Sequence, residues 1–117
     1  VITRMTDYLT ANYDKIDAII GLGDLVTGSI KRVFNQCGVA PGEIPVVGWG
    51  NSLDTTQEVL EGYVNAAQWQ DPQATSYMAL SLAAMVASGI PAGFDITTGA
   101  LYEADRAQVY DDILSGK

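Results

Sequence analysis

Hydrophobic positions along the chain follow two alternating spacings. Apolar residues three and four positions apart predict helices, and short apolar runs ending at a glycine or a polar residue predict buried strands. The predicted strands cover residues 16–21, 44–49, 64–69 and 96–101. The predicted helices cover about residues 2–13, 24–38, 54–63 and 71–88, and a C-terminal stretch with Ala107, Tyr110, Ile113 and Leu114. This alternation predicts an α/β fold, a doubly wound parallel sheet with right-handed crossovers.

Polar residues mark where three of these helices begin. Asp24 is predicted to cap the second helix. Asp54 and Gln57 have the spacing of a capping box ahead of the third helix. The pair Asp71-Pro72 combines an N-cap with a proline at the first helical position, which is a strong helix start.

The helix that begins at Pro72 and runs to about Ser88 contains no charged residue. Its apolar residues lie around most of its circumference, whereas a surface helix keeps one polar face. We therefore expect this helix to be covered on more than one side, by the sheet or by a polypeptide outside the chain. Its solidly apolar part is much shorter than the roughly 20 residues that a membrane span needs, so we expect no membrane insertion.

Composition narrows the possible functions. Lys plus Arg number 6 and Asp plus Glu number 14, so the formal net charge at pH 7 is −8. An acidic surface repels nucleic-acid phosphates and anionic lipid headgroups, which argues against both as partners. The chain has no histidine and one cysteine, Cys37, which excludes nucleophiles activated by histidine, an internal disulfide and a zinc cluster of thiolates. We expect a protein that is not an enzyme and that holds no metal and no cofactor.

The expected ligand edge follows from the fold. Ligands of doubly wound sheets bind beyond the carboxyl ends of the strands. The first loop there, Gly21-Leu22-Gly23-Asp24, looks like the start of a dinucleotide fingerprint. However, Val26 stands where the third glycine belongs, and the Asp24 carboxylate would lie where a pyrophosphate binds. A tight strand-to-helix turn explains these glycines better, and a flavodoxin-like nucleotide binder is kept as an alternative. The rule selects three loops in all, at residues 21–24, 48–52 and 69–71.

Three side chains in these loops each allow two interpretations. Asp24 is explained by an N-cap, and its carboxylate can also accept hydrogen bonds from a polyol. Asn51 is a typical turn residue, and its amide also offers a donor and an acceptor to a ligand. Trp69 lies between two glutamines at a strand end. It either fills core space or stacks on the C–H face of a sugar while the amides address hydroxyl groups.

Several runs of the chain resemble a known family. They are Ala18-Ile19-Ile20, Gly28 in the following helix, Ile44–Trp49 and Asn65–Pro72. Together they resemble the C-terminal half of type I periplasmic sugar-binding proteins, the solute receptors of ABC transporters, within the ribose-binding group. The chain looks most like the rhamnose and autoinducer-2 receptor branch. The resemblance implies an incomplete Rossmann-like lobe. Residues 1–70 would form part of the C-terminal sugar-binding lobe, 71–93 would cross to the N-terminal lobe, and 94–117 would return through the hinge.

The resemblance also implies ligand contacts. Gln70 matches a hinge glutamine that bonds sugar hydroxyls, and Trp69 lies beside it. The loop Leu22-Gly23-Asp24 matches a contact position that is often asparagine. The family's aspartate after its second strand here falls on Gly50, with Asn51 next to it. These departures favour a smaller or less polar ligand than ribose, such as a deoxy-sugar.

By this resemblance the protein captures a monosaccharide or small polyol between two lobes in the periplasm and delivers it to an ABC permease. The chain opens Val1-Ile2-Thr3-Arg4 with a helix already in progress, so we interpret it as a processed or truncated fragment. Its expected partners are a small-molecule sugar, the permease, and either the missing N-terminal lobe or a second copy of the fragment. The effector-binding domain of a LacI-type regulator shares the fold and is the main alternative.

Overall fold

The structure is a computed structural model that describes residues 1–91 and 99–117. The chain forms two compact units. The first comprises Val1–Trp69 and Leu101–Lys117, and the second comprises Gln70–Ala100. The predicted last strand, residues 96–101, lies partly outside the described residues.

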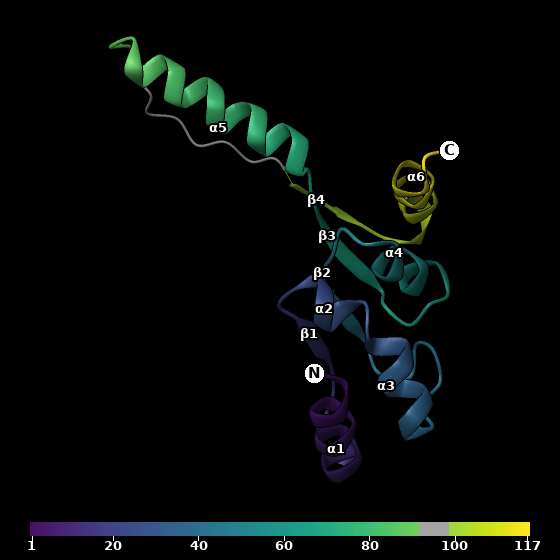
Figure 1. The fold of residues 1–117 in the computed structure, drawn as a ribbon. Coiled ribbons are helices and arrows are strands. Elements are labelled where there is room, and N and C mark those ends of the chain that lie inside the picture. Colours follow the sequence, from purple (N-terminus) through teal and green to yellow (C-terminus); the bar gives the residue numbers. More distant parts are fainter. Residues whose placement is uncertain (92–98) are drawn as a thin grey trace. The chain divides into compact units, whose positions relative to one another are not determined.

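The first unit is built on a sheet whose first three strands run in parallel (Figure 1). The strands are β1 (Ile19–Gly21), β2 (Val46–Trp49), β3 (Ala66–Gln70) and β4 (Gly99–Tyr102), in that spatial order. β1 pairs with β2 and β2 with β3, both in parallel, which confirms the doubly wound α/β prediction. The first three strands begin later than predicted. Before β3, for example, the Asn65 side chain replaces a backbone acceptor of the strand pair. Its Oδ1 accepts a hydrogen bond from the Val46 N–H at 2.8 Å.

The helices follow the predicted order with three local corrections. The predicted helix 24–38 is broken at Gly28-Ser29. A side chain at Gly28 would lie 3.1 Å from Asp54 Cβ and from Thr55 Oγ1, so the absence of a side chain there lets another helix approach. That other helix is capped by Ser52 and not by Asp54, and it ends before Tyr63. The helices are α1 (Ile2–Asn12), α2 (Asp24–Thr27), α3 (Ile30–Cys37), α4 (Leu53–Leu60), α5 (Pro72–Ala87) and α6 (Ala104–Ser115), with a 3₁₀ turn at Tyr13–Lys15.

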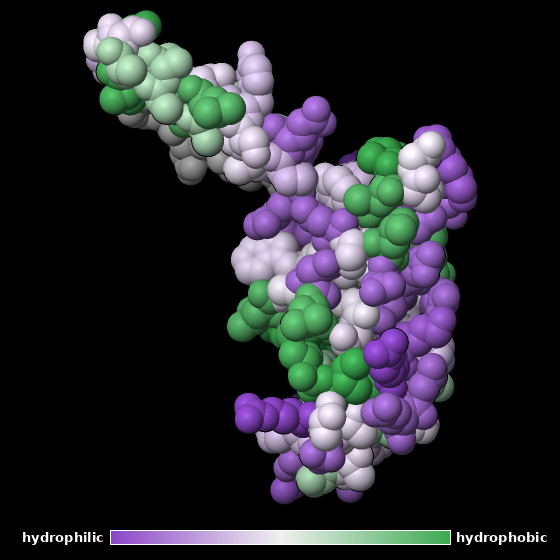
Figure 2. Space-filling model, in the orientation of Figure 1, coloured by the Kyte–Doolittle hydropathy of each residue, from purple (hydrophilic) through white to green (hydrophobic). Residues whose placement is uncertain are grey.

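The core of the first unit is built largely from helices that pack in pairs. Helix α4 packs against α6 and α1 against α3, and these helices bury Phe34, Val59 and Ala107. Along β2, Val46 is fully buried whereas its neighbour Val47 is 42% exposed, as expected when successive side chains point to opposite faces. Hydrophobic atoms gather on the surface where Figure 1 places β1 and α2 (Figure 2). Ile20, Leu22 and Leu25 are 69%, 80% and 71% exposed there.

The second unit consists largely of α5. Asp71 caps this helix as predicted, because its carboxylate accepts a hydrogen bond from the Ala74 N–H at 2.9 Å, and Pro72 stands in the first turn. None of the helix residues is buried, and Tyr77 and Leu80 are more than 70% exposed. The cover that the sequence predicts for this helix remains a prediction. Among the described residues, no helix combines the length and apolarity needed to cross a membrane.

Candidate ligand-binding edge

The loops that follow β1 and β2 meet at the carboxyl edge of the sheet. Gly21 at the end of β1 lies opposite Gly48 in β2, so the segments that follow these two strands leave the sheet side by side. The predicted ligand residues of these loops are Leu22, Gly23, Asp24, Gly50 and Asn51. The structure joins the two loops through Asp24, which lies in the first loop and bonds to the second.

Asp24 makes hydrogen bonds across the sheet edge. Its Oδ1 atom accepts from the Ser52 N–H at 3.2 Å, the Ser52 hydroxyl at 2.9 Å and the Thr55 hydroxyl at 2.7 Å. The N-cap of α2 is Gly23, and no side chain caps that helix. The N-cap interpretation of Asp24 is therefore wrong. The carboxylate accepts hydrogen bonds from donors at the start of α4 instead. These donors are far from Asp24 in the sequence, so the local spacing of residues could not indicate them.

The glycines of the edge allow buried threonines to approach the backbone. A Cβ atom at Gly21 or Gly48 would lie 2.5 or 2.3 Å from the hydroxyl of Thr27. A Cβ atom at Gly50 would lie 2.3 Å from Thr55 Oγ1 and 2.5 Å from Asp24 Oδ1. These approaches explain the glycines by tight packing. Gly23 differs, because a Cβ atom there would meet nothing within 4 Å.

Tyr102 holds the same loop from β4. Its side chain is 1% exposed, and its hydroxyl donates a hydrogen bond to the Gly50 carbonyl oxygen at 3.3 Å. Burial raises the pKa of Tyr102 to about 12, and the charge of Asp24 adds to the effect. The phenol therefore stays protonated and remains a donor. Sequence reasoning missed Tyr102, Ser52 and Thr55. The one local signal in the sequence was that Ser52, two residues after Gly50, is a polar residue typical of turns.

Trp69 packs against α6. Its ring stacks on that of Tyr110 with centroids 4.3 Å apart and planes 9° from parallel. The Tyr110 ring in turn meets Tyr102 edge to face at 4.8 Å. This half-buried position agrees with the core-filling interpretation of Trp69, and its contact with a sugar stays a prediction. Trp49, at the end of β2, is the more open indole, with 43% of its surface exposed.

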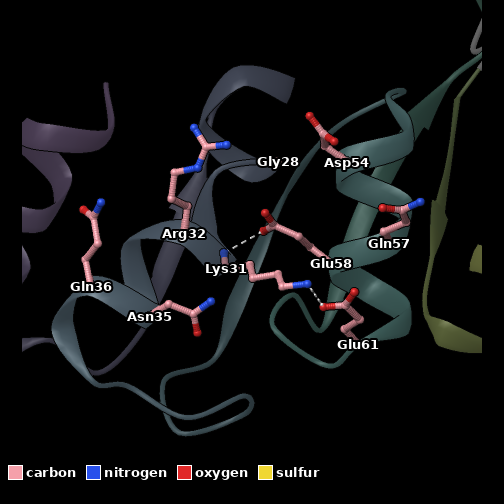
Figure 3. A pocket seen from close by; sticks show the side chains of 9 residues that line it. All are labelled: Gly28, Lys31, Arg32, Asn35, Gln36, Asp54, Gln57, Glu58 and Glu61. Atoms are coloured by element: carbon pink, nitrogen blue, oxygen red, sulfur yellow. Dashed lines mark hydrogen bonds and ion pairs between the residues drawn. The ribbon is translucent and has the colours of Figure 1, made fainter.

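A separate groove of about 440 Å³ runs between α3 and α4 (Figure 3). Glu58 is 5% exposed and accepts a hydrogen bond from the Lys31 N–H at 3.1 Å. Burial raises the pKa of Glu58 to about 7, and the charge of Asp54 adds to this. Lys31 also forms an ion pair with Glu61, both half exposed, where such pairs contribute little. Among residues 1–91 and 99–117, no three side chains are placed to hold a metal.

A family model for the periplasmic binding protein domain matches residues 2–91. The chain belongs to this family. Its members are binding proteins and not enzymes, and the family implies a periplasmic or extracellular location. Comparison by sequence with curated proteins gives no match.

Solved structures share the fold of this periplasmic binding protein chain. A carbohydrate transporter solute binding protein from Agrobacterium radiobacter, in complex with D-arabinose, has a TM-score of 0.77 and 20% identity over 97% of the chain. The Caulobacter myo-inositol binding protein has a TM-score of 0.75 and 17% identity over 99% of the chain. The arabinose transporter's binding protein from Shewanella sp. ANA-3 has a TM-score of 0.71 and 16% identity over 98%. The chain spans 38–40% of the length of these proteins.

Two further residues of this periplasmic binding protein chain, Asn51 and Gln70, are predicted to contact the ligand. Asn51 is half-buried between Gly50 and Ser52 in the loop that Asp24 holds. Gln70 is the exposed last residue of β3 and belongs to the second unit. Both remain predictions as ligand contacts.

Proposed function

We propose that this chain is part of the substrate-binding component of a sugar ABC transporter that works in the periplasm. The observation that carries the proposal is the joined edge of β1 and β2, with its Asp24 hydrogen bonds to Ser52 and Thr55, in a chain of the periplasmic binding protein family. This edge is where a doubly wound sheet receives its ligand. The net charge of −8 disfavours the DNA-bound regulator that shares the fold.

The proposed ligand is a monosaccharide or small polyol with one apolar face, such as a deoxy-sugar. Leu22 is 80% exposed and Trp49 43% exposed, and both stand at the ends of strands that reach the edge. An apolar side chain and an indole ring suit the C–H face of a sugar. Hydroxyl groups would be met by the amides of Asn51 and Gln70.

In the complete receptor the sugar would close between two lobes, and the closed form would dock on the permease. Residues 1–70 would belong to the C-terminal lobe, 71–93 would cross to the N-terminal lobe, and 94–117 would return through the hinge. The uncovered helix α5 supports this division, because it has no buried residue. Its cover would be the N-terminal lobe or a second copy of the chain.

The test is an NMR titration of the isotope-labelled chain with D-arabinose, myo-inositol and L-rhamnose. We expect at least one of these to shift the backbone amides of residues 22–24 and 50–52. Replacing Gln70 with alanine should weaken that binding at least tenfold, and Gln73→Ala, at an exposed glutamine in α5, is the matched control. If none of the three compounds shifts these amides, the sugar-binding proposal is wrong. An unchanged affinity in Gln70→Ala would remove Gln70 from the site.

A further inference from the structure

The loop of residues 50–52 is fixed by groups from two other segments. On one side Asp24 Oδ1 accepts from the Ser52 N–H, the Ser52 hydroxyl and the Thr55 hydroxyl at 2.7–3.2 Å. On the other side the buried Tyr102 hydroxyl donates to the Gly50 carbonyl oxygen. Thr55 is fully buried, so Asp24 reaches down from the edge to an anchored group. Asn51 therefore lies in a loop whose residues on both sides are held.

The hydrogen bonds of Asp24 also arrange the cap of α4. The Ser52 hydroxyl donates to Asp24 and accepts from the Thr55 N–H at 3.2 Å. Its proton is directed to the carboxylate, which leaves its lone pairs for the helix end. Hydrogen bonds linked in this way strengthen one another. A negative charge near the first turn of a helix is favourable as well. The single carboxylate thus orders both the loop and the start of the helix behind it.

Packing against Thr55 and Asp24 also holds the loop in place. A side chain at Gly50 would collide with Thr55 and with Asp24 itself, so the loop already lies against both. Removing the carboxylate takes away three hydrogen bonds and one of the two groups packed against the loop, so the loop would be held less firmly. Such a change would alter where Asn51 offers its amide.

We propose that Asp24 is a positioning residue, which acts on the ligand through the loop of residues 50–52 and not by contact with the sugar. The inference rests on the proposed function, because it assigns the loop to ligand binding. A loop held in one position would also set the selectivity of the site. Sugars whose hydroxyl groups do not meet the polar groups of the loop would be rejected, because unpaired polar groups at a binding site cost free energy.

The first test measures the loop itself by amide hydrogen exchange. In Asp24→Ala, exchange at Asn51 and Ser52 should accelerate at least tenfold. Asp24→Asn keeps an oxygen acceptor at the same place and should restore most of the protection. If Asp24→Ala fails to fold, Thr55→Val serves as the test, because it removes the hydroxyl that donates to Asp24 and should also accelerate exchange at Asn51 and Ser52. Asp54→Asn, at the second residue of α4, removes a charge outside the loop and is the control. Unchanged exchange in Asp24→Ala would overturn the proposal, whether or not any sugar binds.

The second test separates positioning from direct contact. Sugar affinity, measured by the titration described above, should fall at least tenfold in Asp24→Ala and be largely restored in Asp24→Asn. In a Ser52→Ala background the same Asp24→Ala change should cost clearly less, because the two residues act through shared hydrogen bonds. An undiminished loss in that background would mean that Asp24 contacts the sugar directly, which would contradict the proposal. If the unaltered chain binds none of the sugars, the proposed function fails, and the exchange measurement still decides the positioning role.

Discussion

Glu58 should make the first unit less stable as the pH rises. The side chain lies on α4 with 5% of its surface exposed, and it accepts a hydrogen bond from the Lys31 N–H at the start of α3. Burial raises its pKa from the ordinary 4.5 to about 7, with the Asp54 charge adding to the rise; the backbone N–H groups of Lys31 and Ile30 and the Lys31 charge oppose it. Between about pH 4.5 and pH 7, Glu58 therefore keeps its proton in the folded chain and has lost it in the unfolded chain.

The sign and size of the effect follow from linkage between protonation and folding. A pKa that is raised in the folded state gives a stabilisation that is complete below about pH 4.5 and is lost as the pH rises through 7. A rise from 4.5 to about 7 corresponds to at most ~3.4 kcal/mol at ~1.36 kcal/mol per pKa unit. Because the groove beside the carboxylate admits water, we expect about 1–2 kcal/mol.

The perturbation is Glu58→Gln, which removes the titrating group and keeps a carbonyl oxygen for the Lys31 N–H. Urea unfolding at pH 5 and pH 8 gives the free energy of unfolding at each pH. Between these two pH values the Glu58→Gln variant should lose about 1–2 kcal/mol less stability than the unaltered chain. Glu61→Gln, at a half-exposed glutamate in the same groove, should leave the pH dependence nearly unchanged. Equal pH dependence in Glu58→Gln and the unaltered chain would refute the reasoning.

Two further predictions concern packing and assembly. Gly50→Ala should destabilise the chain by about 1–3 kcal/mol in thermal unfolding, because its Cβ would lie 2.3 Å from Thr55 Oγ1, whereas Gly23→Ala has open space and should change little. Equal melting temperatures for the two variants would contradict the packing argument. The chain alone should self-associate or retain a companion polypeptide, because α5 exposes Leu80 and its neighbours. Light scattering tests this, and a monodisperse monomer that Leu80→Lys leaves unaltered would show that α5 needs no cover.

The order of elements was predictable because it depends on local patterns. The strands and the Asp71-Pro72 helix start appear in the sequence as short runs and as spacing, and the structure has both. The prediction that the strands are buried is wrong for β1 and β2, because Ile20 and Val47 are 69% and 42% exposed. The break at Gly28 was not predictable in this way. Gly28 lies against Asp54 and Thr55 of α4, and periodicity describes only the helix to which a residue belongs.

The meeting of two loops at the sheet edge was predictable, but the hydrogen bonds that join them were not. The rule for doubly wound sheets selected the loops after β1 and β2, and the structure joins them. The partners of Asp24 are 28 and 31 residues away in sequence, so an N-cap, which is a local role, was the interpretation that spacing favoured. Trp69 was singled out for its neighbours, yet the ring that it meets, Tyr110, comes from the last helix.

The contrast between Gly23 and the other glycines of the edge has a consequence for how such a receptor can diversify. Gly21, Gly48 and Gly50 are fixed by the threonines packed against them, so substitutions there disturb the fold before they affect the ligand. Gly23 faces open space with an extended φ of 174°, a conformation that any residue adopts, and it precedes Asp24. A new side chain at this one position would enter the ligand edge while the scaffold beneath stays intact. Under the proposed function, selection or a designed library can therefore change what this edge binds without first repairing how the chain folds.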